Sequence, residues 1–129
     1  MSDAEATPDY DALLRANLER VFNERDPNRR ALAVADIYID DPIMFEPDGV
    51  VRGRDAISAT AGRLLDQFGP TFSFVPRGKA VGHHGMAVLR WCAGREGEPV
   101  VVTGADVAEF EGARIARLWV LLDPQPTLS

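Results

Sequence analysis

The sequence predicts an α+β domain in which three N-terminal helices pack on a strongly curved, mostly antiparallel sheet that forms a conical cavity. Three observations lead to this fold class. Apolar residues recur at helical spacing only in the first half of the chain. The second half alternates apolar and polar residues between glycine-rich turns. Helices followed by a long run of strands are typical of α+β domains, whose helices cover one face of the sheet.

Three amphipathic helices are predicted, over about 8–24, 26–40 and 54–68. Thr7-Pro8-Asp9 has the composition of a helix start, with an N-cap, a proline in the first turn and an acidic residue after it. The second helix is expected to end at Asp40-Asp41-Pro42, because the residue before a proline is disfavoured in the α conformation.

Short strands are expected at 43–46 and 50–52, joined by a turn at Pro47-Asp48-Gly49. Four long strands follow, at about 71–81, 86–94, 100–111 and 114–122. The expected domain organisation is a tail over 1–7, one domain over 8–123 and a second tail over 124–129.

Composition sets the general class. The 129 residues are enough for one domain with a core, and 46% hydrophobic with 26% charged residues is globular composition. A net charge of −6 argues against binding to nucleic acid or to an anionic membrane surface. We find no apolar run long enough for a membrane span, no secretory signal and one cysteine, Cys92, so a cytoplasmic location is expected.

Asp106 is the main candidate for a functional residue. Alternation along its strand places Val102, Gly104, Asp106, Ala108 and Phe110 on one face, which is otherwise apolar. A lone buried charge is costly, so such a carboxyl takes up a proton or finds a partner. The pattern favours a hydrogen-bond donor or acid/base group in a pocket. The alternative is a solvated residue near a strand end.

Four stretches carry a resemblance to known proteins: Asp40–Pro47 (DDPIMFEP), Val51–Ile57 (VRGRDAI), Gly104–Phe110 (GADVAEF) and Gly112–Leu118 (GARIARL). With the order of elements, they resemble the nuclear transport factor 2 superfamily and its bacterial SnoaL-like branch, which lies alongside ketosteroid isomerases, limonene epoxide hydrolases and polyketide cyclases. The resemblance covers roughly residues 8–123. It implies a cone-shaped fold, a homodimer and a hydrophobic small-molecule ligand.

The resemblance to ketosteroid isomerases implies roles for two carboxyls. Glu46, before Pro47, falls where those enzymes place their proton-shuttling base. Asp106 falls where they place a protonated aspartic acid that donates to an oxyanion. Leu18 stands where their oxyanion-hole tyrosine is expected, so that donor is missing.

The resemblance to epoxide hydrolases fits less well. Their charged trio would fall at Ala87, Leu89 and Val120, and none of these side chains activates water. The chain therefore resembles the superfamily but matches neither reference active site.

Together, Glu46 and Asp106 would form a two-carboxyl site in an apolar cup. Two neighbouring carboxyls in an apolar site acquire different pKa values. One is then ionised and can act as a base, and the other keeps its proton and can donate a hydrogen bond. The pair could move a proton α to a carbonyl, as in an isomerase, cyclase or dehydratase. The alternative for Glu46 is a solvated residue beside the turn at Asp48. The alternative function is a non-catalytic ligand-binding or protein-interaction dimer.

The walls of this site are expected to be apolar or aromatic. Trp91 and Tyr38 are the predicted positioning walls, and both are also reasonable core residues. The further predicted ligand contacts are Asn17, Leu18, Met44, Leu89, Phe110 and Val120. His83-His84 lies between glycines with no third ligand at metal spacing, so no metal site is expected. The sequence contains no glycine-rich phosphate loop or dinucleotide fingerprint, so no other cofactor is expected.

The outer face of the sheet is the predicted partner surface. Strand alternation gathers apolar side chains there, at Met86, Val88, Thr103, Ala105, Val107 and Trp119. An apolar face of this size favours a symmetric homodimer.

Overall fold

The computed structural model describes residues 7–124. Almost all of the two predicted tails lies outside the described residues. The elements are α1 (Tyr10–Ala16), the π-helix η1 (Asn17–Phe22), α2 (Pro27–Ile37), β1 (Tyr38–Glu46), β2 (Gly49–Arg52), α3 (Arg54–Phe68), β3 (Phe72–His83), β4 (Met86–Arg95), β5 (Val102–Glu111) and β6 (Arg114–Leu122).

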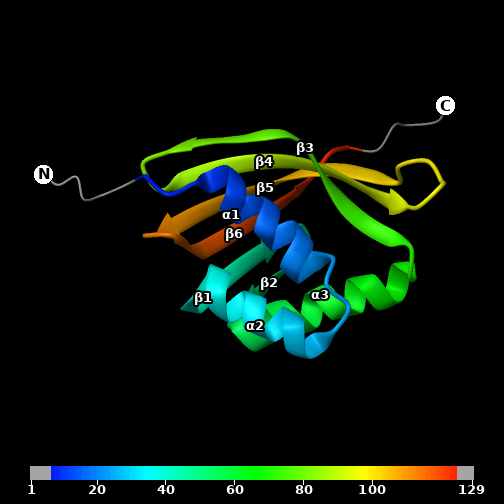
Figure 1. Ribbon diagram of the computed structural model, residues 1–129, viewed down its shortest axis with the longest axis horizontal. Helices are drawn as coiled ribbons and strands as arrows, with labels where there is room; N and C mark the ends of the chain where they lie inside the picture. Colours follow the sequence, from blue (N-terminus) through cyan, green and yellow to red (C-terminus); the bar gives the residue numbers. More distant parts are fainter. Residues whose placement is uncertain (1–6, 125–129) are drawn as a thin grey trace, which may run out of the picture.

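One six-stranded sheet has the order β2-β1-β6-β5-β4-β3. Its neighbours pair antiparallel except β1 and β6, which are parallel. The helices lie on one side of this sheet (Figure 1): α1 and η1 contact β3, and α2 and α3 contact β1. The predicted α+β class, with helices packed on a mostly antiparallel sheet, is confirmed.

The first helix differs from its prediction at its C-terminal half. Instead of one α-helix to Glu24, the α-helical turns end at Ala16 and six residues of π-helix follow. A π-helix has a wider turn and is frequent at functional sites. Here it buries the adjacent residues Asn17 and Leu18 together.

The predicted end of the second helix is wrong by three residues, since α2 ends at Ile37 and Tyr38 begins β1 with an extended backbone. Sheet pairing explains the earlier end, because Tyr38 pairs with Ile115 of β6. The Arg54 guanidinium also binds the carbonyls of Tyr38 and Ile39 at 2.7 and 2.9 Å, which fixes the turn from helix to strand.

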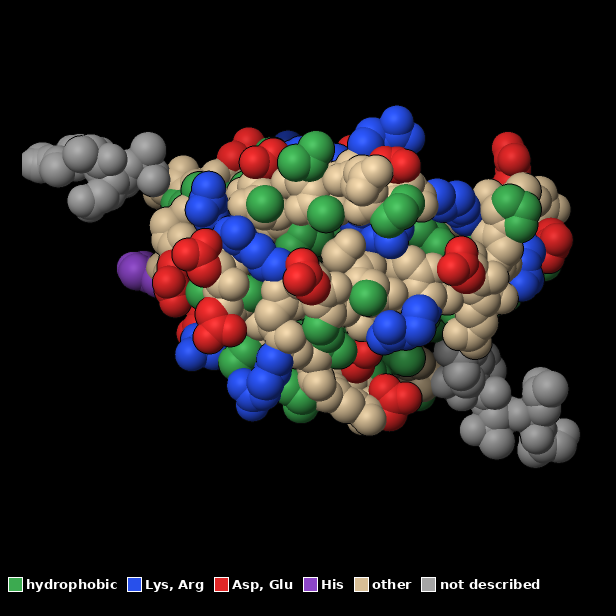
Figure 2. Space-filling model, turned by 90° about the horizontal axis from the view of Figure 1, so that it is seen from below, with side chains coloured by type: hydrophobic (Ala, Val, Ile, Leu, Met, Phe, Trp, Pro, Cys, Tyr) green, Lys and Arg blue, Asp and Glu red, His purple; other side chains and the backbone are tan. Residues whose placement is uncertain are grey.

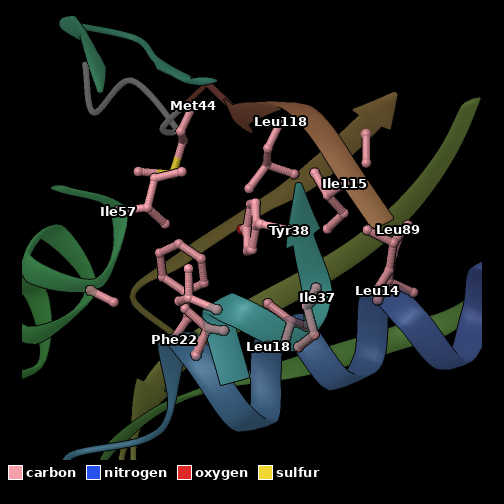
Figure 3. Packing of buried hydrophobic residues seen from close by; sticks show 14 of the residues in the cluster. Leu14, Leu18, Phe22, Ile37, Tyr38, Met44, Ile57, Leu89, Ile115 and Leu118 are labelled. Carbon is pink, nitrogen blue, oxygen red and sulfur yellow. The ribbon is translucent and has the colours of Figure 1, made fainter. Parts of the chain in front are cut away.

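The core lies between the helices and the concave face of the sheet. Figure 3 shows Tyr38 in the middle of it, among side chains from α1, η1, α3 and the strands. Leu14, Leu18, Ile57 and Leu118 are among the fully buried members. In the part of the chain that the structure describes, no helix has the length and apolarity needed to cross a membrane.

Candidate active site

A cavity of about 550 Å³ opens among the helices and the sheet. Most of its wall is apolar, and five of its residues are aromatic: Phe22, Phe68, Phe72, Phe74 and Trp91. These rings form one connected cluster, in which Phe74 meets both Phe72 and Trp91 edge-on at centroid distances of 5.4 and 5.2 Å. The remaining apolar wall is Leu18, Pro47, Leu64, Val101, Val102, Val120 and Leu122.

The ionisable side chains among the described residues of the cavity wall are all carboxyls: Glu46, Asp48 and Asp106. Of the described residues that line it, none is Lys, Arg or His. The cavity therefore offers hydrogen bonds and negative charge to a ligand, and it offers an anionic ligand no counter-charge.

Asp106 is held at the buried side of this cavity by β5. Its side chain is 3% exposed, and the predicted face of the strand is confirmed by the burial of Ala108 and Phe110. Trp91, diagonally opposite on β4, donates its indole N–H to Asp106 Oδ1 at 3.0 Å. Burial raises the pKa of Asp106 from 3.8 to about 7, against the lowering effect of hydrogen bonds from Trp91 and Asn17.

Asn17 and Tyr38 lie close behind Asp106. The Tyr38 hydroxyl donates to Asn17 Oδ1 at 2.7 Å, and both side chains are buried. Asn17 is close enough to lower the pKa of Asp106, yet its Nδ2 has no hydrogen-bond partner of good geometry among the described residues. Burial, and then the charge of Asp106, raises the pKa of Tyr38 well above its ordinary value, so its hydroxyl keeps its proton.

Glu46 ends β1, opposite Gly49 of β2, and is half-buried. Burial and then the nearby Asp48 carboxylate raise its pKa, while Arg63 lowers it. Burial is the first cause of both pKa shifts, where we expected repulsion between Glu46 and Asp106 from the sequence. Both carboxyls line the same cavity.

The structure brings five of the predicted site residues together on the cavity wall: Leu18, Glu46, Trp91, Asp106 and Val120. The other five are buried in the core and do not line the cavity: Asn17, Tyr38, Met44, Leu89 and Phe110. Tyr38 and Asn17 reach the site only through hydrogen bonds. Phe110 packs against Tyr10 at a centroid distance of 5.0 Å instead.

The sequence analysis missed most of the aromatic wall. Phe72 and Phe74 are two residues apart on β3 and therefore share a face, and Leu64 and Phe68 are four apart on α3. Both spacings can be read from the sequence. That they meet at one cavity depends on how α3 is placed against β3.

Over residues 7–124, no group of three or more His, Cys, Asp and Glu side chains is arranged to hold a metal ion.

Comparisons with known proteins place this geometry in a wider group. A family model described as a SnoaL-like domain matches residues 14–118. No curated protein matches the sequence.

Among solved structures, a SnoaL-like family protein of Agrobacterium tumefaciens, proposed as an isomerase, has a TM-score of 0.80 at 24% identity, covering 88% of this chain and 96% of that one. A proposed polyketide cyclase from Sinorhizobium meliloti has a TM-score of 0.66 at 14% identity, with coverages of 84% and 93%. A proposed ketosteroid isomerase from Kribbella flavida has 0.67 at 14% identity, with coverages of 92% and 81%. At these identities the similarity establishes a shared fold.

Proposed function

This chain belongs to the SnoaL-like domain family, and on that basis we propose that it is a cofactor-free isomerase, cyclase or dehydratase. It would move a proton α to a carbonyl in an uncharged hydrophobic molecule. One observation supports this above all: a carboxyl on the wall of an apolar cavity, nearly fully buried, has a pKa of about 7. At neutral pH such a carboxyl exists in part as the neutral acid, which can donate a hydrogen bond to negative charge that develops on a substrate oxygen.

The two carboxyls take different roles in this proposal. Glu46, half-buried beside Asp48, is the base: its carboxylate accepts the α-proton while the C–H electron pair forms the enolate. Asp106 in its protonated form donates a hydrogen bond to the enolate oxygen. Return of the proton from Glu46 to another carbon completes an isomerisation.

The substrate is proposed to be uncharged and to contain a flat or aromatic group. Phe72, Phe74 and Trp91 offer ring faces and edges for stacking. The carboxyl-only polar lining disfavours a carboxylate or phosphate on the ligand, because burial of an anion without a counter-charge is costly.

Exchange of α-hydrogens with deuterated water tests the proposal without knowledge of the natural product. The probe ketones are 2-tetralone and 1-indanone. Proton NMR at pD 7 measures the loss of their α-hydrogen signals in the presence of the full-length protein. We expect catalysed exchange that falls by roughly 10²-fold or more in Asp106→Asn and in Glu46→Gln. Asp36→Asn is the control, since Asp36 is exposed on α2 and pairs with Arg20. Normal exchange in either site variant would remove that residue's role.

A non-catalytic binding module of the same fold is the second candidate. Leu18 favours a binding function, because this side chain makes only apolar contacts with the cavity. The ketosteroid isomerases that the chain resembles have a hydroxyl donor at this place. Saturable binding of both ketones without α-hydrogen exchange would support this function instead.

We also propose a homodimer through the outer face of the sheet. Val107 and Trp119 are paired across β5 and β6 there, and Trp119 stacks on Phe45 at 5.0 Å. Met86 and Leu121 each expose about half of their surface. Figure 2 shows the molecule from below in the view of Figure 1, where hydrophobic side chains are scattered among charged ones.

Light scattering after gel filtration tests this assembly. Val107→Lys places a charge in the middle of the proposed interface, so we expect a monomer. Leu32→Lys, at an exposed position of α2, is the matched control and keeps the dimer. A monomeric native protein would exclude the interface.

A further inference from the structure

Asn17 is an unusual buried polar residue. It has no exposed surface, yet the Nδ2 of its amide has no hydrogen-bond partner of good geometry among the described residues. A buried amide donor without a partner is destabilising, because it has lost its hydrogen bonds to water. Such a group calls for an explanation in terms of function.

Tyr38 fixes the orientation of this amide. A tyrosine hydroxyl has one hydrogen, and Tyr38 donates it to Asn17 Oδ1 at 2.7 Å. The carbonyl end of the amide is therefore turned to Tyr38 and the NH₂ end away from it. The Asp106 carboxyl is the candidate acceptor for this amide: a side-chain hydrogen bond from Asn17 is among the causes that lower its pKa, although Nδ2 makes no hydrogen bond of full geometry.

The π-helix makes this placement possible. Leu18, the next residue along η1, lines the cavity, whereas Asn17 is turned to Tyr38 and Asp106 behind the cavity wall. The wider turn of the π-helix buries the adjacent residues Asn17 and Leu18 together. The fold thereby places an apolar contact in the cavity and an amide behind Asp106.

We propose that Tyr38 and Asn17 are positioning residues for Asp106: the Tyr38 hydroxyl holds the Asn17 amide with its NH₂ directed at the Asp106 carboxyl. Trp91 supplies a second N–H from β4. The role in catalysis rests on the proposed function, but the arrangement exists without substrate.

The physical consequence is a carboxyl that can exist in both protonation states. Burial alone favours the neutral acid, and two N–H donors favour the carboxylate. The groups that act on Asp106 come from η1, β1 and β4. Of these, only Tyr38 is titratable, and it stays protonated. Glu46 and Asp48 are the other titratable side chains among the described residues of the cavity wall.

Titration of Asp106 by carbon-13 NMR of its carboxyl carbon tests the proposal in the ligand-free protein. In Tyr38→Phe the amide loses the group that orients it, so we expect Asp106 to bind its proton roughly tenfold more tightly. Asn17→Leu removes the donor and should act in the same direction. Tyr10→Phe is the control, because the Tyr10 hydroxyl bonds Gly85 and is not among the groups that act on Asp106.

A second measurement tests the proposal if Tyr38→Phe or Asn17→Leu does not fold. The chain has two tyrosines, Tyr10 and Tyr38, so 3-fluorotyrosine incorporated into Tyr10→Phe labels only position 38. The more acidic phenol is a stronger donor to Asn17, and we expect Asp106 to bind its proton more weakly.

The outcomes separate this proposal from the proposed function. An unchanged Asp106 titration in Tyr38→Phe, or in the fluorinated protein if Tyr38→Phe does not fold, overturns the positioning role even if Asp106→Asn abolishes α-hydrogen exchange. A shifted titration supports it even if the protein exchanges no ketone.

Discussion

A single carboxyl, Asp106, links the site to the stability of the protein. Its proton is bound more tightly in the folded chain than in an unfolded one, where its pKa has the ordinary value near 3.8. Below about pH 4 the group is protonated in both states and adds no penalty. As the pH rises toward 7, only the unfolded chain loses the proton, so folding becomes less favourable.

We therefore predict that Asp106→Asn gains stability relative to the native protein as pH rises. The gain between pH 4 and pH 8 should reach up to about 4 kcal/mol, from a shift of about three pKa units. Urea denaturation at several pH values measures it. The test is how the difference in unfolding free energy between the variant and the native protein changes with pH. Any effect of the new amide on packing adds the same amount at every pH and does not alter this change.

Asp11 provides a control of opposite sign. The Ala80 amide and the Arg15 guanidinium lower the pKa of this partly buried carboxyl. Asp11→Asn should therefore lose stability relative to the native protein as pH rises through the acidic range. Parallel pH profiles for the two variants would contradict our assignment of Asp106.

At the scale of elements, pairing of β4, β5 and β6 brings Trp91 to Asp106. Gly104 of β5 lies opposite Trp91 on β4 and Leu122 on β6. An added Cβ at Gly104 would collide with the Leu121 carbonyl and approach the Trp91 ring to 2.9 Å. Glycine at this position therefore allows the indole to lie close to the strand, where it bonds Asp106.

We predict that Gly104→Ala destabilises the protein by about 1–3 kcal/mol, since backbone and ring must both move. It should also shift the Trp91 indole N–H signal in a proton–nitrogen NMR spectrum. Gly49→Ala on β2 is the matched control, with open space around the added methyl group. Equal stabilities of the two variants would show that the sheet accommodates a side chain at Gly104.

Arg54 explains why the Gly-Arg-Asp-Ala-Ile stretch marks the fold. It begins α3, and its guanidinium binds the carbonyls of Ala35, Tyr38 and Ile39 at 2.7 to 3.2 Å. One side chain thus satisfies carbonyl groups at the end of α2 and ties three elements together. The motif stabilises the junction between α2 and β1, and it contributes no group to the cavity.

At the scale of the whole molecule, negative charge coincides with the ligand cavity. The chain has a net charge of −6, and the cavity's polar lining consists of carboxyls. The electric field of the whole chain and the carboxyls that line the cavity therefore both repel an anionic ligand.

We predict that a neutral ligand binds at least about tenfold more tightly than its anionic counterpart at pH 8, a difference of about 1.4 kcal/mol or more. The matched probes are the neutral 2-acetylnaphthalene and the anionic 2-naphthoate. Titration calorimetry measures the dissociation constant of each. Glu46→Gln should narrow the difference, and Asp36→Asn should not. Equal affinities for the two probes would contradict an uncharged substrate.

Much of this molecule could be predicted from local patterns. The strand face that carries Asp106, the position of Trp91 beside it and the α+β order follow from alternation, turn residues and helical spacing. Each depends on contacts between residues close in sequence or on neighbouring strands. Glu46 and Asp106 both line the cavity, but they come from β1 and β5, which are not neighbours in the sheet. The family resemblance, and not a local pattern, suggested that these two carboxyls meet.

Other features depended on contacts between distant segments. Tyr38 was expected in a helix, but pairing with β6 and the carbonyl contacts of Arg54 make it the first residue of β1. The π-helix at Asn17 and the aromatic wall from α3 and β3 also arise only when the elements pack. The sequence by itself determined which face is apolar and which carboxyl it buries. Only the tertiary structure decided which donors surround that carboxyl, because hydrogen bonds between distant segments depend on packing and not on local spacing.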